Sequence, residues 1–231
     1  MEKVSVCMAT FNGAKFVKRQ LLSILPQLEP LDEIIISDDN STDDTVSVIN
    51  SIHDKRIKVH LNKIGSGPTA NFQNALYLCS GDIIVLCDQD DIWLPTKLSD
   101  IRHALSTSDL VITDCIVVDE KEQIIHESFF ALRNSRKGFW RNLYKNSYVG
   151  CCMAFKKEVL SYSLPFPRHI HMHDWWIGLC VEKLGKVYFL DKPLIKYVRH
   201  GNNASPTGEA GYNLLTKLIN RLQLLFYIIF R

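Results

Sequence analysis

Short apolar runs alternate with amphipathic stretches through the first half of this 231-residue chain. Two of the runs, 34–36 and 83–87, are apolar at every position, which is typical of strands buried on both faces of a parallel sheet. The predicted strands are Val4–Met8, Glu33–Ser37, Ile57–Leu61, Ile83–Cys87 and Leu110–Thr113. The predicted helices between them are 14–25, 41–52 with Ser41 as N-cap, 69–79 and 97–105. This alternation predicts an α/β fold, a Rossmann-like three-layer α/β/α core with a mostly parallel sheet.

The pattern changes after Asp114. Residues 119–147 read as polar and irregular, followed by a strand over Tyr148–Phe155 and a helix over Trp175–Leu184. Val187–Leu190 and Leu194–Val198 read as a closing strand pair. We expect one domain over 1–211, divided into halves 1–114 and 115–211, with the second half an extension of the first. Residues 212–231 are then a separate C-terminal helix.

Three carboxylates follow the apolar run Ile83–Cys87. Asp88, Asp90 and Asp91 lie at the expected carboxyl end of a buried strand, where open α/β sheets bind ligands. Carboxylate oxygens are suited to hard cations such as Mg²⁺ or Mn²⁺. The competing interpretation is a polar turn before a helix, but a helix cap needs one carboxylate rather than three. The sequence therefore predicts a metal site.

The net charge and the cysteines indicate which partners and which cellular compartment to expect. The formal net charge is only +2, and the body of the sequence has no basic, aromatic-interleaved stripe, so we expect no nucleic-acid partner. The seven cysteines form no CxxC pair, and several lie in strand-like runs, as small core residues in a reducing cytosol would. Met1-Glu2-Lys3 leads straight into a strand, so we expect no signal peptide.

The C-terminal residues 212–231 combine apolar residues at helical spacing with only positive charges. Lys217, Arg221 and Arg231 are the charged residues, and the uninterrupted apolar part is shorter than the roughly 20 residues needed to span a bilayer. Such a helix can lie in a membrane interface. The alternative is a helix docked on the domain or in a dimer seam.

Five segments in order resemble the family 2 glycosyltransferases, inverting enzymes with a GT-A fold. The segments are Val4 to Gly13, Ile36 to Thr45 (similar to a "DDxSxDxT" signature), Cys87 to Trp93 (similar to a DxD element), His173 to Trp176, and Tyr197 to Asn203 (similar to "Y-R-x-H-x-x-N"). The resemblance covers Val4 to about Asn203. It implies a nucleotide-binding half over 1–114 and an acceptor-side half over 115–211.

The resemblance also implies a nucleotide site. It assigns base recognition to Thr10, Phe11 and Asn12 and to Asp38 or Asp39, where an aspartate accepts the pyrimidine ring N–H and Phe11 stacks on the ring. For Asp38 and Asp39 the alternative role is helix capping. Further candidates that border the donor are Asn71, Asp88, which would contact the ribose or metal-bound water, and Arg199, which would neutralise the diphosphate.

The chemistry requires charge stabilisation and a base. Asp90 is the first candidate for metal ligand by analogy with the family motif, with Asp88 and His200 as further ligands of Mn²⁺ or Mg²⁺. Asp174 is the candidate base, because it opens a helix whose dipole favours its ionised form. Trp175 or Trp176 would form a sugar-stacking wall. An ordinary helix cap is the alternative for Asp174, and an exposed loop residue without a role is the alternative for His200.

Three other functions stay open. His171 and His173 beside Asp174 can also bind a transition metal, as in a zinc hydrolase. A sugar nucleotidyltransferase would use a similar core, although Ala9 to Gly13 holds only one glycine. A non-catalytic, membrane-associated assembly subunit could keep the fold alone.

The resemblance places the expected reaction in bacterial surface polysaccharide synthesis, such as that of O-antigen or capsule. We expect dTDP-rhamnose as donor, with UDP-galactose, UDP-glucose and UDP-GlcNAc as alternatives that the sequence does not separate. The expected acceptor is a saccharide linked to undecaprenyl diphosphate. The expected location is cytoplasmic, peripheral on the inner face of the cytoplasmic membrane.

Overall fold

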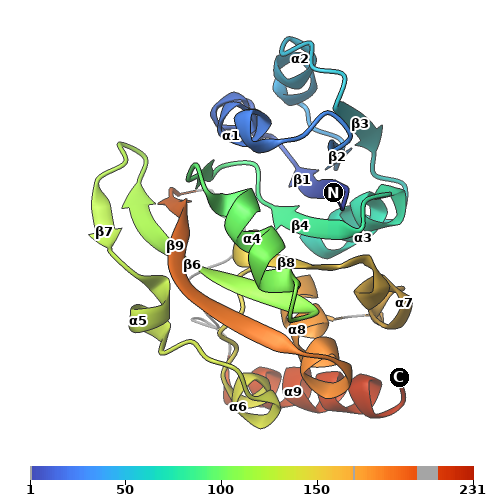
Figure 1. Cartoon of the computed structure of the whole chain (residues 1–231). Helices are drawn as coiled ribbons and strands as arrows, with labels where there is room; N and C mark the ends of the chain where they lie inside the picture. Colours follow the sequence, from blue (N-terminus) through green and yellow to red (C-terminus); the bar gives the residue numbers. More distant parts are fainter. Residues whose placement is uncertain (1, 169, 202–212) are drawn as a thin grey trace.

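A computed structural model describes residues 2–168, 170–201 and 213–231 of the chain. The described residues form one curled, mostly parallel sheet with the strand order β3-β2-β1-β4-β8-β6-β9-β5, to which β7 is added beside β6 (Figure 1). The strands are β1 (Val4–Thr10), β2 (Glu33–Asp38), β3 (Ile57–Leu61), β4 (Ile83–Cys87), β5 (Ile92–Trp93), β6 (Leu110–Asp119), β7 (Ile124–His126), β8 (Met153–Lys156) and β9 (Val187–Arg199).

Helices cover both faces of the sheet. The chain moves from β1 outward to β3 and then returns past β1 to β4, so right-handed crossovers place α1 and α2 on one face and α3 on the other. The helices are α1 (Val17–Ile24), α2 (Thr45–Asn50), α3 (Pro68–Leu78), α4 (Lys97–Leu105), α5 (Phe129–Arg133), α6 (Phe139–Tyr144), α7 (Leu160–Ser163), α8 (His173–Leu184) and α9 (Leu214–Ile229). Short 3-10 turns are η1 (Leu25–Gln27), η2 (Gly150–Cys152) and η3 (Lys157–Val159). The predicted α/β core is confirmed.

The neighbouring strands β1 and β4 form the switch point of the sheet. They run parallel, with Met8 beside Cys87, while their connections lead in opposite directions. The carboxyl ends of two such strands bound a crevice in which doubly wound sheets bind ligands. The loops that follow Thr10 and Cys87 therefore meet at one place.

The second half departs from the sequence prediction in three ways. Residues 119–147 are not irregular, because they contain the end of β6 together with β7, α5 and α6. The predicted closing strand pair is wrong, since Val187–Arg199 is a single strand that pairs with β6 in parallel and absorbs the intervening Pro193 at register shifts. The predicted strand over Tyr148–Phe155 begins only at Met153, after the turn η2.

The predicted helix cap at Ser41 is also wrong. Helix α2 begins at Thr45, and the Ser41 hydroxyl donates to Asp38 Oδ1 at 2.6 Å. Asp43 Oδ1 instead accepts the Thr45 amide at 3.0 Å. Polar side chains in this segment hold a loop rather than a helical turn, which is the competition expected of Ser and Asp near a strand end.

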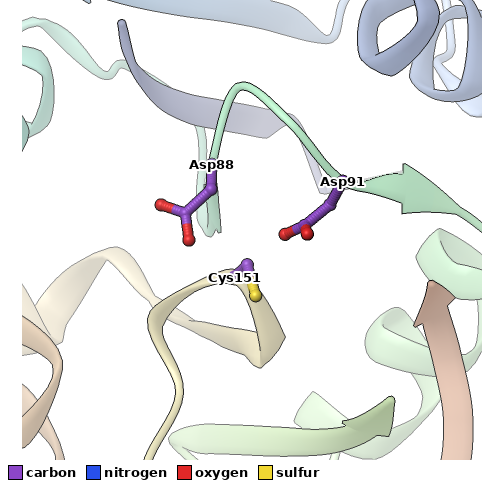
Figure 2. Close-up of side chains that lie close together, drawn as sticks. All are labelled: Asp88, Asp91 and Cys151. Atoms are coloured by element: carbon purple, nitrogen blue, oxygen red, sulfur yellow. The ribbon is translucent and has the colours of Figure 1, made fainter. Parts of the chain in front are cut away.

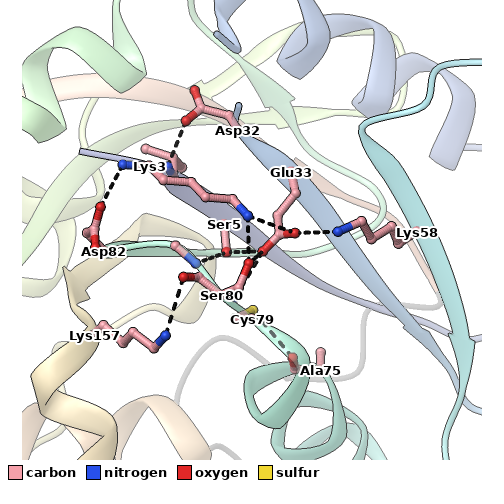
Figure 3. A network of polar contacts seen from close by, with 12 residues as sticks. Lys3, Ser5, Asp32, Glu33, Lys58, Ala75, Cys79, Ser80, Asp82 and Lys157 are labelled. Carbon is pink, nitrogen blue, oxygen red and sulfur yellow. Dashed lines mark hydrogen bonds and ion pairs between the residues drawn. The ribbon is translucent and has the colours of Figure 1, made fainter. Parts of the chain in front are cut away.

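A polar network holds the amino ends of the central strands (Figure 3). Glu33, at the start of β2, accepts hydrogen bonds from the hydroxyls of Ser5 and Ser80, each at 2.7 Å, and from Lys58 Nζ at 2.7 Å. Burial would raise the pKa of Glu33, but these donors hold that pKa well below its usual range. Every oxygen of this carboxylate is occupied, and it lies at the end of the sheet opposite the crevice. We read this cluster as structural.

The seven cysteines are all buried and free, as their place in apolar runs predicted. The two tryptophans of α8 are fully buried in the same core cluster. In the ranges that the structure describes, none of the helices combines the length and apolar character needed to cross a bilayer.

Candidate active site

Gln89 joins the two loops at the switch point. Its Oε1 accepts the Phe11 amide, and its Nε2 donates to the Phe11 carbonyl, both at 3.0 Å. A Cβ on Gly13 would lie only 2.2 Å from Gln89 Oε1, so a side chain there would displace the Gln89 amide from its contacts with Phe11. The middle residue of Asp88-Gln89-Asp90 thus aligns the loop after β4 with the loop after β1.

Asp38 and Asp39 have different surroundings. Asp38 is buried, and its carboxylate accepts the Thr10 hydroxyl at 2.8 Å and both the amide and hydroxyl of Ser41. Asp39 is half-buried and accepts the Gly67 amide at 2.7 Å and the Asn62 side chain at 2.8 Å. Asp38 therefore has a structural role in this structure, and Asp39, on the more accessible side, is the better candidate for a base contact.

The remaining nucleotide-side candidates lie in or beside the loop that follows β1. Phe11 is 54% exposed, so its ring is available for stacking. Asn12 Oδ1 accepts the Thr42 amide at 2.8 Å, which fixes its side chain in the loop. Asn71 donates to the Thr10 carbonyl at 3.0 Å, while its buried Oδ1 has no hydrogen-bond partner among the described residues. Asn12 and Asn71 therefore hold the loop after β1, and Phe11 projects from it.

Asp90 is paired with His200. Asp90 Oδ2 lies 2.7 Å from His200 Nε2, and the His200 ring stacks on Phe16 with 4.4 Å between ring centroids. The structure thus brings together two side chains that are 110 positions apart and that the sequence proposed as ligands of one cation. Arg199, next to His200, lies with its guanidinium 5.9 Å from the Tyr197 ring centroid.

A second group of side chains that could ligate a metal lies close to this pair. One oxygen each of Asp88 and Asp91 and the sulfur of Cys151 lie within 4.8 Å of one another, and Figure 2 shows the three side chains facing a common centre. Burial and the charges of Asp90 and Asp174 raise the pKa of Asp88 to about 8. Burial and the same crowding by Asp90 and Asp88 raise the pKa of Asp91. Asp91 Oδ2 has no hydrogen-bond partner in the described part of the chain.

This crowding fits a divalent cation. Several carboxyls placed together without enough donors repel one another, and a bound cation relieves both the repulsion and the unmet hydrogen-bonding capacity. The oxygens suit Mg²⁺ or Mn²⁺, whereas the Cys151 sulfur is a softer ligand.

Asp174 lies buried in the first turn of α8. Its Oδ1 accepts the amide of Trp175 at 2.7 Å, and the Gly150 amide also donates to its carboxylate. Burial raises the pKa of Asp174 to about 6 despite these donors. The charge of Asp174 is close enough to raise the pKa of Asp88 in turn. A carboxylate with a pKa near 6 is suited to accept a proton at neutral pH.

The expected sugar-stacking wall of Trp175 and Trp176 is wrong. Both side chains are fully buried, and their ring N–H groups donate to the carbonyls of Asn142 and Ser163, each at 2.8 Å. Both rings are therefore part of the core and cannot stack on a sugar.

The zinc interpretation of His171 and His173 also lacks support. The His173 ring stacks on Phe72 at 4.1 Å between centroids, and burial lowers the pKa of His173 to about 3. His171 is exposed beside Asn220 of α9. Within the described ranges, no group of three ligating side chains includes either histidine.

Two residues near the carboxylates, Cys151 and Lys97, were not predicted from the sequence. Cys151 lies in the turn η2, which no motif marks. Lys97, at the start of α4, is fully buried, and its Nζ donates to the Cys151 carbonyl at 2.9 Å. A buried lysine at the start of a predicted helix cannot be distinguished from an exposed one by sequence spacing alone.

The sequence of the chain is similar to those of known proteins. The sequence profile described as glycosyl transferase family 2 matches residues 5–163. The chain is 35% identical to WfaP of Escherichia coli, a UDP-Glc:α-D-GlcNAc-diphosphoundecaprenol β-1,3-glucosyltransferase, over 80% of this chain and 72% of WfaP. It is 28% identical to the dTDP-rhamnosyl transferase RfbG of Shigella flexneri, over 93% of this chain and 80% of RfbG.

The fold is similar to that of a solved structure. Residues 1–349 of TarS from S. aureus, in complex with UDP, superpose with a TM-score of 0.73 at 20% identity, over 99% of this chain and 66% of that one. The predicted GT-A fold is confirmed by this likeness together with the family match.

Proposed function

Since the chain belongs to glycosyl transferase family 2, we propose that it moves a sugar, with inversion, from a nucleoside-diphosphate donor to a saccharide hydroxyl. The observation that carries the proposal is the meeting of Asp88 and Asp174 at the switch point. They come from opposite halves of the chain, and the charge of Asp174 raises the pKa of Asp88. Glycosyl transfer needs such a place, where a leaving diphosphate and a hydroxyl that loses a proton lie close together.

Asp174 acts as the base in this proposal. The acceptor oxygen forms a bond to the anomeric carbon as the bond from that carbon to the diphosphate oxygen breaks. The hydroxyl proton moves to the Asp174 carboxylate, and the electron pair of the broken bond leaves with the diphosphate. The amides of Gly150 and Trp175 fix the orientation of the carboxylate during this transfer.

Asp90 and His200 would hold a divalent cation, Mn²⁺ or Mg²⁺, with Asp88 beside them. Bound there, the cation would neutralise the charge that develops on the leaving diphosphate. Support comes from the 2.7 Å pairing of Asp90 with His200 and from the like-charge crowding of Asp88, Asp90 and Asp91. Arg199, adjacent to His200 in sequence, would add a positive charge for the same diphosphate.

We propose a uridine or thymidine diphosphate sugar as the donor. WfaP is named for UDP-glucose and RfbG for dTDP-rhamnose, so these two are the first to test. Phe11 would stack on the pyrimidine, and Asp39 would accept its ring N–H. The WfaP name also supports a diphosphoundecaprenol-linked acceptor. With such an acceptor, we propose a role in polysaccharide synthesis at the inner membrane surface.

Asp90→Ala tests the site. Stabilisation of the wild-type chain by UDP or dTDP should require Mn²⁺ or Mg²⁺, measured as a shift in thermal unfolding. Asp90→Ala should remove the cation-dependent shift and keep the midpoint without ligand. Asp191→Ala, on an exposed side chain of β9, is the matched control and should behave as wild type.

Transfer separates the proposal from the other two functions. Product formed from UDP-glucose or dTDP-rhamnose with a lipid-linked saccharide would support it. Formation of a nucleotide sugar from a sugar phosphate and a nucleoside triphosphate would instead indicate a nucleotidyltransferase. Nucleotide binding with neither reaction would indicate a non-catalytic subunit.

A further inference from the structure

Helix α9 packs on the domain with an apolar side turned outward. Leu224 and Ile228 are buried against the core, and they occupy only one side of the helix. The opposite side, here called the outer face of α9, spans about half the circumference at 100° per residue and is apolar apart from Gln223 at its edge. Its most exposed apolar members are 54–85% accessible: Leu214, Leu215, Leu218, Leu222, Phe226, Ile229 and Phe230.

Polar contacts hold the helix in this orientation. The Arg221 guanidinium donates to the Tyr144 carbonyl of α6, with the Nε contact at 2.8 Å, and it lies 5.5 Å from the Trp175 ring centroid. Lys183 Nζ of α8 donates to the Ile228 carbonyl at 2.6 Å, and Arg231 Nε donates to the Tyr162 carbonyl at 3.0 Å. The basic groups of α9 thus face the protein, and the apolar groups face outward, which is the reverse of an ordinary surface helix.

The neighbouring helix α6 extends this surface with aromatic and basic side chains. Trp140 and Tyr144 are 71% and 77% exposed, and α6 packs against α9 near the Arg221 contact (Figure 1). Residues 136–145 contain four basic residues and no acidic residue, although the whole chain is nearly neutral. Exposed apolar residues flanked by amphipathic aromatics and positive charge match the interface of an anionic bilayer.

We propose that the outer face of α9, together with Trp140 and Tyr144, docks this protein on an anionic membrane surface. The proposal rests on the proposed function, in which a lipid-linked acceptor must reach Asp174. The Arg221 guanidinium, on the inward side of α9, lies 5.5 Å from the ring centroid of Trp175, so α9 packs on the turn of α8 that also carries Asp174. An acceptor whose lipid stays in the bilayer would present its saccharide close to the crevice.

Vesicle binding tests the surface without any substrate. The purified chain should float with vesicles of phosphatidylglycerol and phosphatidylcholine, and less with phosphatidylcholine alone. The double variant Leu222→Gln/Phe226→Gln should reduce the partition coefficient at least roughly tenfold, because each side chain loses much of its transfer free energy. The matched control is Leu31→Gln/Tyr77→Gln, which changes two exposed apolar side chains far from α9 and should bind as wild type. Lys137→Gln/Lys145→Gln should lower binding to anionic vesicles only.

Two further readouts separate the possible failures. With a water-soluble acceptor that lacks the lipid, the Leu222→Gln/Phe226→Gln variant should keep wild-type turnover, so a loss of vesicle binding is not a loss of the active site. Unchanged vesicle binding by this variant would overturn the docking surface and leave the proposed function intact. A wild-type dimer in light scattering that the variant converts to a monomer, with vesicle binding unaffected, would assign the face to a second copy of the chain and would also overturn the proposal.

Discussion

Replacing Asp174 with asparagine should make the protein more stable at neutral pH while it abolishes sugar transfer. Burial raises the pKa of Asp174 from its ordinary value of 3.8 to about 6. Between these two values the unfolded chain releases a proton that the folded chain retains, so stability falls as pH rises through this window. One pKa unit corresponds to about 1.4 kcal/mol, and the ionised carboxylate therefore costs about 3 kcal/mol at pH ~8. Asparagine keeps the shape and can accept the Trp175 amide without this charge.

Chemical denaturation at several pH values measures the effect. In EDTA and without nucleotide, the variant should exceed the wild type in unfolding free energy by about 1.5 kcal/mol at pH ~5 and about 3 kcal/mol at pH ~8. Asp191→Asn, an exposed carboxylate of β9, is the control and should show no such trend. The gain would be an instance of stability exchanged for function at a site that holds a buried charge.

A variant that is less stable than the wild type, or a difference that is flat from pH 5 to pH 8, would refute the reasoning. Either result would mean that the ionised carboxylate is well satisfied and that its burial does not disfavour its charge. Activity gives an independent check, since kcat/KM of the wild type should rise with pH through about 6 as Asp174 loses its proton.

Two more substitutions test the crevice. With Mn²⁺ present, Asp88→Asn should weaken UDP binding by about tenfold, because the ionised carboxylate that the cation favours is lost as an acceptor for the ribose. It should weaken dTDP binding less, because deoxyribose lacks the 2′-hydroxyl. Equal losses in titration calorimetry would contradict a ribose contact. Lys97→Met should raise Mn²⁺ affinity in the presence of UDP several-fold, because the buried Lys97 ammonium acts on Asp88 and therefore repels a cation held by the same carboxylates. Lys63→Met, on an exposed side chain, is the control, and wild-type affinity in Lys97→Met would show that the ammonium serves only the Cys151 carbonyl.

The first half of the fold could be predicted because its signal is local. Runs such as Ile83–Cys87 are apolar on both faces only where helices cover both sides of a sheet, and β4 has the bounds that the sequence predicted. The second half could not be predicted in this way. β9 contains Pro193 and several exposed positions, and its pairing with β6 is a long-range contact that no local pattern encodes.

The candidate site was also predictable only in part. The order of motifs predicted that these side chains lie together, and the structure brings Asp90 to His200 and Asp174 close to Asp88. Orientation was less predictable. Trp175 and Trp176 follow Asp174 directly, but successive helical residues point about 100° apart, so Asp174 can lie near Asp88 while the next two side chains pack in the core.

Buried carboxylates of this protein differ in their supply of hydrogen-bond donors, and that difference separates structure from function. Glu33 lies at the amino ends of the strands and receives donors from Ser5, Ser80 and Lys58, which hold its pKa low despite burial. Asp91, at the carboxyl end, keeps one oxygen without a partner among the described residues, and its pKa is raised. A fold selected for stability alone would satisfy both groups, since an unsatisfied buried carboxyl is costly. Among the described residues, the carboxylate oxygen that lacks a hydrogen-bond donor lies at the carboxyl end of the strands. This lack of donors is the physical reason to propose that the cation and the diphosphate bind at that end.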